Sequence, residues 1–147
     1  MSGYEWHLRS EGFDEALHDL RALEASLQHG AVRAGLVRAI APTKRLAKRL
    51  APQDTGAMAR AIGHRSLSKS AKSRLGIPAQ NVALLVGPNR KVNGRWQGRK
   101  GMWQELGTEH MEANPFMTPA LEQTQSGMAG RFYHGLRDYL DRKGLRT

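Results

Sequence analysis

Apolar residues recur at helical spacing in three parts of the chain. The first, over residues 13–27, predicts an amphipathic helix that ends at His29-Gly30. The second, over residues 31–50, predicts a helix that Pro42 should kink or split, because proline lacks an amide hydrogen. The third, over residues 118–142, predicts a closing helix with the apolar stripe Leu121, Met128, Phe132, Leu136, Tyr139 and Leu140.

Shorter segments predict strands and loops between these helices. Residues 4–11 alternate enough for a short strand, with Trp6 and Leu8 on one side. A strand is expected within residues 56–70, and the apolar run 81–86 predicts another, ended by Gly87-Pro88. Residues 66–76 are expected to form a loop, residues 89–101 a long flexible basic loop or a hairpin tip, and residues 102–106 a helical turn.

This order of elements predicts an α+β fold. Helices come first, a few strands follow, and a helix closes the chain. We expect a small, mostly antiparallel sheet, with two N-terminal helices and a long C-terminal helix packed on it. At 147 residues, the whole chain, 1–147, is expected to be a single domain.

Two short segments have the composition of tight corners. In Ala-Pro-Gln-Asp-Thr-Gly-Ala, residues 51–57, Pro52 should stop the preceding helix, Asp54 and Thr55 can bond the local backbone, and Gly56 tolerates a positive φ. In the second segment Gly107 and Thr108 follow Glu105, and Pro115 and Phe116 come shortly after. There, Thr118-Pro119 is typical of an N-cap followed by the first helical position.

Together, in this order, the two segments resemble the neck or tail-completion family of long-tailed phages, the tail components of lambda-like and Hong Kong-type phages. In that family an Ala-Pro-x-Asp-Thr-Gly segment ends the N-terminal helices. A Glu-x-Gly-Thr segment then leads into Pro-Phe-x-x-Pro-Ala and a C-terminal helix. The resemblance covers about residues 5–140. Its motif residues here are Pro52, Asp54, Thr55, Gly56, Glu105, Gly107, Thr108, Pro115, Phe116 and Pro119.

The resemblance implies a structural virion protein of the head–tail junction rather than an enzyme. Such a protein would form a homo-oligomeric ring around the DNA channel, with a hexamer as the expectation from tail symmetry. Its partners would be neighbouring connector, stopper, tail terminator or tail tube proteins, with phage DNA as a further partner. It would lie in the virion, and in the host cytoplasm during assembly, without cofactor or membrane.

The net charge of +10 is concentrated in the middle of the chain. Residues 55–104 contain no Asp or Glu, whereas basic and acidic residues balance in the remainder. A segregated field of this kind indicates an anionic partner or an acidic protein surface; the alternative is a solvated face. For a ring, the basic segment could meet the acids of the first predicted helix on the next subunit: Asp14, Glu15, Asp19 and Glu24.

The basic loop is the candidate interface or DNA-channel segment. It carries Arg90, Lys91, Arg95, Trp96, Arg99 and Lys100. The basic side chains could neutralise phosphates while Trp96 stacks on a base. An arm that docks on a neighbouring subunit and plain solvation are the alternatives, and the resemblance favours the arm. A free basic nucleic-acid-binding domain is the second hypothesis for the whole protein.

Enzymatic and metal-site alternatives have weaker support. Asp54-Thr55-Gly56-Ala57 also matches the active-site tetrad of retroviral-type aspartic proteases, but here it follows a basic helix end rather than an apolar strand. Glu105, Glu109, His110 and Glu112 lie close enough in sequence for a metal site to be conceivable, and a solvated loop is favoured. The chain has no cysteine. Its first residues do not resemble a signal peptide, and no apolar run predicts a membrane span.

Overall fold

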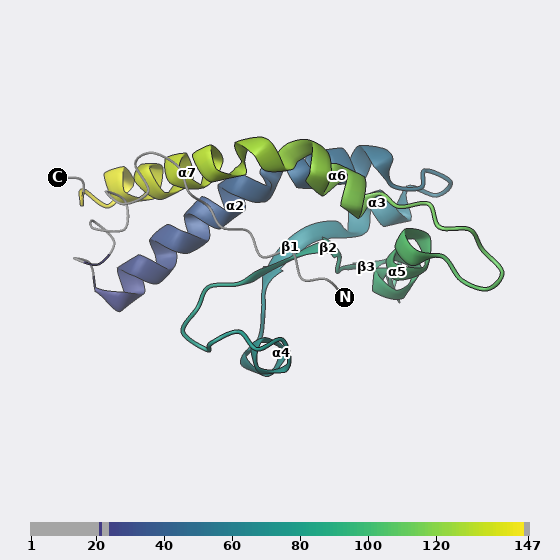
Figure 1. Cartoon of the computed structure of the whole chain (residues 1–147), viewed down its shortest axis with the longest axis horizontal. Coiled ribbons are helices and arrows are strands. Elements are labelled where there is room, and N and C mark those ends of the chain that lie inside the picture. Colours follow the sequence, from purple (N-terminus) through teal and green to yellow (C-terminus); the bar gives the residue numbers. More distant parts are fainter. Residues whose placement is uncertain (1–20, 22–23, 146–147) are drawn as a thin grey trace. The chain divides into compact units, whose positions relative to one another are not determined.

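A computed structural model describes residue 21 and residues 24–145 (Figure 1). Within this part, helices dominate and the strands form small antiparallel pairs, which confirms the α+β class. The predicted strand at 4–11 and most of the predicted first helix lie outside the described residues. Of the acids assigned to that helix, only Glu24 is described, and it is exposed.

The described chain divides into two compact units. One contains the residues up to Ala39 and those from Gly127 onward, and the other contains Ile40–Ser126. Helix α2, Ala25–Leu50, belongs to both, because its first part lies in the first unit and its last part in the second. The expectation of a single domain therefore stays a prediction.

In the first unit, α2 packs on α7, Met128–Arg142. Ala31, Leu136 and Leu140 are buried together, as the predicted apolar stripe requires. The predicted helix end at His29-Gly30 is wrong, since α2 continues through both residues. Packing explains this: a Cβ at Gly30 would lie 2.7 Å from Cζ of Tyr139, so the glycine makes room for a ring rather than ending a helix.

Pro42 lies inside α2 and does not split it. Proline removes the hydrogen bond that residue 42 would donate to the carbonyl of Arg38. Contacts on both sides hold the helix nevertheless. Arg131 Nε donates to the carbonyl of Ala39 at 3.0 Å in the first unit. In the second unit, Oγ1 of the buried Thr43 lies 2.6 Å from Oγ1 of Thr124.

The second unit begins with the end of α2 at Leu50, as Pro52 predicts. The expected strand within residues 56–70 is half right: α3, Ala57–Ala61, comes first, and β1, Ile62–Ser66, follows. The expected loop at 66–76 is wrong, because α4, Lys69–Arg74, forms there. Ser68 starts α4, since its hydroxyl accepts the amide hydrogen of Ala71.

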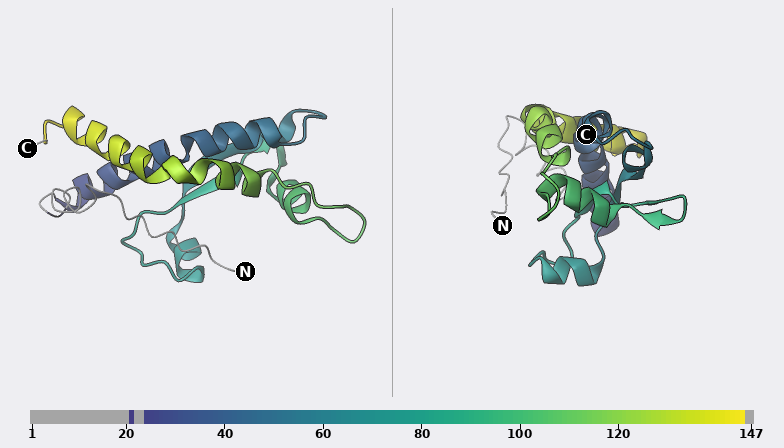
Figure 2. Two further views of the ribbon diagram at one scale, coloured as in Figure 1. Left: turned by 45° about the horizontal axis from the view of Figure 1, so that its top comes forward. Right: turned by 90° about the vertical axis from the view of Figure 1, so that its right-hand side faces the viewer.

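Strand β2, Leu84–Pro88, pairs antiparallel with β1. It starts later than the predicted run 81–86, and Gly87 and Pro88 belong to it rather than ending it. The expected basic loop is a two-stranded hairpin of β3, Lys91–Val92, and β4, Arg95–Trp96. Figure 2 (right) shows the hairpin projecting beside α5. Helix α5, Gly98–Leu106, is longer than the predicted turn at 102–106.

The predicted closing helix is divided. Helix α6, Met117–Thr124, is followed by a 3-10 turn, Gln125–Gly127, and then by α7. Its beginning also differs from the prediction, since Phe116 and not Thr118 occupies the N-cap position. Pro119 is therefore the third helical residue. The first amides of a helix have no carbonyl partner within it, so the missing amide hydrogen of proline costs no helical hydrogen bond at this position.

Candidate functional site

The first motif segment turns the chain from α2 into α3. Gln53 Nε2 donates to the carbonyls of Lys48 and Ala51 at 3.0 and 2.8 Å, which covers the end of α2. The hydroxyl of Thr55 accepts the amide hydrogen of Ala57. Gly56 has φ +70°, so the prediction of a left-handed corner is confirmed. No hydrogen bond to the exposed Asp54 side chain is found in the described part of the chain.

The second motif segment is organised by one carboxylate. Glu105, near the end of α5, accepts the amide hydrogens of Phe116 and Met117 on Oε2, at 2.9 and 3.0 Å. Its Oε1 accepts both the amide and the hydroxyl hydrogen of Thr118. These are the first amides of α6, which have no partner inside the helix. Glu105 thus caps α6 from a different helix, which is why Thr118 is not the N-cap.

The same bonds change the acidity of Glu105. Partial burial raises its pKa, but the bonds from Thr118, Met117 and Phe116 outweigh burial, so the pKa of this carboxyl lies below its ordinary value. The site at the beginning of α6 therefore holds a carboxylate at neutral pH. A negative charge at a helix N-terminus is also favoured by the helix dipole.

Gly107 and Thr108 form the turn between Glu105 and the segment that it caps. Gly107 has φ +76°, and a Cβ there would lie 2.9 Å from the amide nitrogen of Ala113. Thr108 and Met111 form an isolated antiparallel bridge, and the amide of Asn114 donates to the carbonyl of Gln104 at 2.7 Å. The backbone after α5 therefore folds back on α5 and brings Phe116 to Glu105.

Both motif segments contribute to one hydrophobic core. Phe116 is 1% exposed and therefore lies in the core. It shares the core of the second unit with Ala51 of the first segment and with Ala120, which follows Pro119. Met58 and Ile62, directly after the Asp-Thr-Gly corner, complete this cluster together with Ala47. The motif residues thus position backbone and core.

The candidate interface residues gather on the hairpin and the beginning of α5. All six are exposed: Arg90, Lys91, Arg95, Trp96, Arg99 and Lys100. Trp96 is 63% exposed, and Lys91 Nζ lies 5.5 Å from the centre of its ring. Gln97, by contrast, is buried and bonds the carbonyl of Arg95. The hairpin is therefore an exposed basic arm, and the buried Gln97 holds the end of the arm that joins α5.

A second basic group, which the sequence did not single out, lies at β1. Lys44 Nζ is 2.8 Å from Nδ1 of His64. The guanidinium of Arg90 lies over Gly63, where a Cβ would come within 2.7 Å of its Nε. Burial, followed by the charges of Lys48, Arg90 and Arg45, lowers the pKa of Lys44. The basic surface of the hairpin therefore continues through Arg90 to the lysines and arginine on α2.

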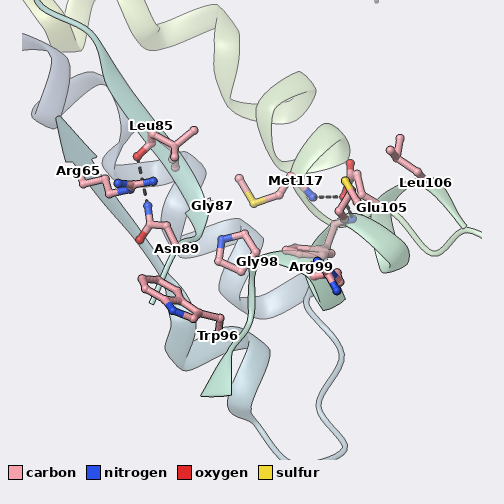
Figure 3. A pocket seen from close by; sticks show the side chains of 15 residues that line it. Arg65, Leu85, Gly87, Asn89, Trp96, Gly98, Arg99, Glu105, Leu106 and Met117 are labelled. Carbon is pink, nitrogen blue, oxygen red and sulfur yellow. Dashed lines mark hydrogen bonds between the residues drawn. The ribbon is translucent and has the colours of Figure 1, made fainter. Parts of the chain in front are cut away.

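An apolar groove lies beside the hairpin (Figure 3). It has a volume of about 520 Å³ and runs between β2 and one face of α5. Leu85, Met102 and Leu106 line it and are 37%, 53% and 71% exposed. The sequence analysis did not identify this groove. The only signal was the pair of apolar residues four positions apart on α5, Met102 and Leu106.

The described residues offer little support for a protease site or a metal site. Asp54 lines a hollow of about 290 Å³, and none of the other residues around that hollow is acidic. Glu105 is occupied by α6, while Glu109, His110 and Glu112 are exposed, and the described residues contain no cluster of three metal-binding side chains. Within the same residues, no helix is both long and apolar enough to cross a membrane.

Comparisons with protein-family models, with curated proteins and with solved structures give no match for this chain.

Proposed function

We propose that this chain is a structural protein of the phage head–tail junction, which forms a ring that joins or terminates the tail at the capsid connector. The observation that carries the proposal is the role of the motif residues. Glu105, Gly107 and Phe116 hold one helix start, and Gly56 makes the corner that leads into the same core. A motif composed of capping, turning and packing residues supports an architectural role better than a catalytic one.

The exposed charges support a role in assembly. Of the ten basic residues in the acid-free segment, only Lys72 is buried, with its Nζ bonded to the carbonyl of Ala79. The other nine remain on the surface of the second unit. Such a field suits acidic protein surfaces and the phosphates of channel DNA. The ring would be homo-oligomeric, with six subunits as the expectation, and it would contact connector, stopper, terminator or tube proteins.

The experiment is to express the chain alone and together with the products of its neighbouring genes, and to measure the mass of each species by light scattering. The proposal expects a closed ring, or a complex with a tail or connector protein. A chain that stays monomeric in every combination would contradict it.

A free nucleic-acid-binding domain is the second candidate, because Trp96 is exposed within a basic hairpin. Salt-dependent binding of short DNA by the isolated monomer, lost in Trp96→Ala, would favour it. In the ring hypothesis, the monomer binds DNA weakly, and Trp96→Ala affects assembly instead.

A further inference from the structure

The outer edge of β2 is open for a further strand. The amide of Leu67 donates to the carbonyl of Ala83, in the same register that pairs Arg65 with Leu85 and Gly63 with Gly87. Hydrogen bonds alternate along an antiparallel pair. Ala83, Leu85 and Gly87 therefore bond toward β1, and Leu84, Val86 and Pro88 direct their backbone groups outward. Within the described chain, β2 pairs with β1 alone.

The apolar groove lies along this open edge. Five consecutive residues, 85–89, line it, as expected when a groove follows the edge of a strand rather than one face. The outward carbonyl of Pro88 points toward the start of α5, because a Cβ at Gly98 would lie 3.6 Å from its oxygen. Figure 3 shows Leu85, Leu106 and Met117 around the groove. Open backbone groups beside exposed apolar side chains are the features of a strand-addition site.

The charges around the groove favour an acidic strand. Arg65 and Arg99 line it, and its carboxylate, that of Glu105, is already bonded to three amides of α6. An incoming strand with apolar side chains on one side and carboxylates among the others would match both the groove and its margin.

The chain itself contains such a sequence. Residues 4–11, Tyr-Glu-Trp-His-Leu-Arg-Ser-Glu, alternate with Trp6 and Leu8 on one side, and the two carboxylates of Glu5 and Glu11 outnumber the single guanidinium of Arg9 on the other. This segment lies outside the described residues, and the match concerns its sequence. We propose that residues 4–11 of a second copy of this chain add to the outer edge of β2, with Trp6 and Leu8 in the apolar groove.

The inference rests on the proposed function and deepens it, because it names the two surfaces that meet in the ring. One subunit would donate its N-terminal segment, and the next would accept it on β2. Such a contact is heterologous, as a closed ring of more than two subunits requires.

The absence of cysteine allows a direct test by crosslinking. One variant carries Leu8→Cys, a second carries Leu106→Cys, and the two purified proteins are mixed with a short bismaleimide. We expect at least a tenfold excess of the mixed dimer over the matched mixture of Leu8→Cys and Leu75→Cys. Leu75 is a suitable control, since it is 66% exposed and does not line the groove.

Val86→Pro, introduced into the Leu106→Cys chain, tests the backbone contact. Proline removes the outward amide hydrogen of residue 86 and leaves the bonds between β1 and β2, as edge strands tolerate. We expect the crosslink to fall severalfold while circular dichroism stays unchanged. If this variant unfolds, Met102→Asp in the same Leu106→Cys chain replaces it, because Met102 lines the groove and is 53% exposed, and the substitution places a carboxylate against the incoming strand.

Equal crosslinking of the two mixtures would overturn the proposal. A chain that carries both Leu8→Cys and Leu106→Cys and crosslinks only within itself would also overturn it, since the segment would then bind its own groove. These outcomes involve purified protein alone. They are distinguishable from failure of the proposed function, which is measured by the mass of the assembled species and on phage particles: a ring can form while the two mixtures crosslink equally.

Discussion

The carboxylate of Glu105 accepts both the amide and the hydroxyl hydrogen of Thr118, thirteen residues later in the chain. Together with the amides of Phe116 and Met117, this contact fixes the beginning of α6 to the end of α5. Because a residue of α5 caps the beginning of α6, the Glu-x-Gly-Thr half and the Pro-Phe-x-x-Pro half of the second motif segment depend on each other.

Glu105→Gln should therefore destabilise the protein by about 1–2 kcal/mol, the usual cost of losing a helix cap. The Glu105 carboxylate accepts four hydrogen bonds on two oxygens. Glutamine has one acceptor oxygen, no charge and an NH₂ group in place of the second oxygen, so it cannot accept all four. Urea unfolding monitored by circular dichroism measures the change. Glu109→Gln is the matched control, because Glu109 is exposed. Equal midpoints for the two variants would show that the cap contributes nothing.

The same residue should make stability depend on pH. The pKa of Glu105 is lower in the folded protein than in the unfolded chain, so the folded state favours the deprotonated form. Its contribution is fully present above the unfolded pKa and is lost as pH falls through the folded pKa. Melting temperatures from pH 6 down to pH 3 should fall more steeply for the natural chain than for Glu105→Gln. Parallel curves would contradict this assignment.

Phe116→Ala should cost about 3–5 kcal/mol, because it removes a fully buried ring from the core of the second unit. The control is Trp96→Ala, which alters an aromatic side chain that is 63% exposed and should leave the melting temperature nearly unchanged. A small effect at Phe116 would mean that its ring does not anchor α6.

Asp54→Asn and Gly56→Val separate a structural Asp-Thr-Gly from a catalytic one. Thr55, rather than Asp54, bonds the turn, so the asparagine variant should keep stability within about 0.5 kcal/mol and should support phage growth. Valine at φ +70° is strained, at a cost of order 1–3 kcal/mol, so the valine variant should grow poorly. Growth of the valine variant with failure of the asparagine variant would favour an enzyme.

Much of this architecture was predictable from local sequence, and two of the errors share one physical origin. The end of α2 at Leu50 follows from Pro52, and the left-handed corner follows from Gly56. Gly30 was misinterpreted because its role is to admit Tyr139, which lies more than a hundred positions away. The Glu105 cap is likewise a contact between segments. Local patterns record neighbours along the chain, not partners that folding brings together.

The hairpin requires a narrower test than deletion of residues 89–101. Such a deletion would remove the buried Gln97 and the first turn of α5, so loss of function could reflect misfolding. Reversing the charges at Lys91 and Arg95 to Glu leaves both in place. We expect an unchanged melting temperature and a loss of head–tail joining of at least tenfold, counted as infectious particles. Normal titres would show that the arm has no role in assembly.

The most direct test of the proposed function is electron microscopy of lysates from a phage that lacks this gene, with the natural chain supplied from a plasmid as the control. The account predicts separate DNA-filled heads and tails without the gene, and joined particles when the natural chain is restored. Intact infectious virions in its absence would contradict a structural role at the head–tail junction.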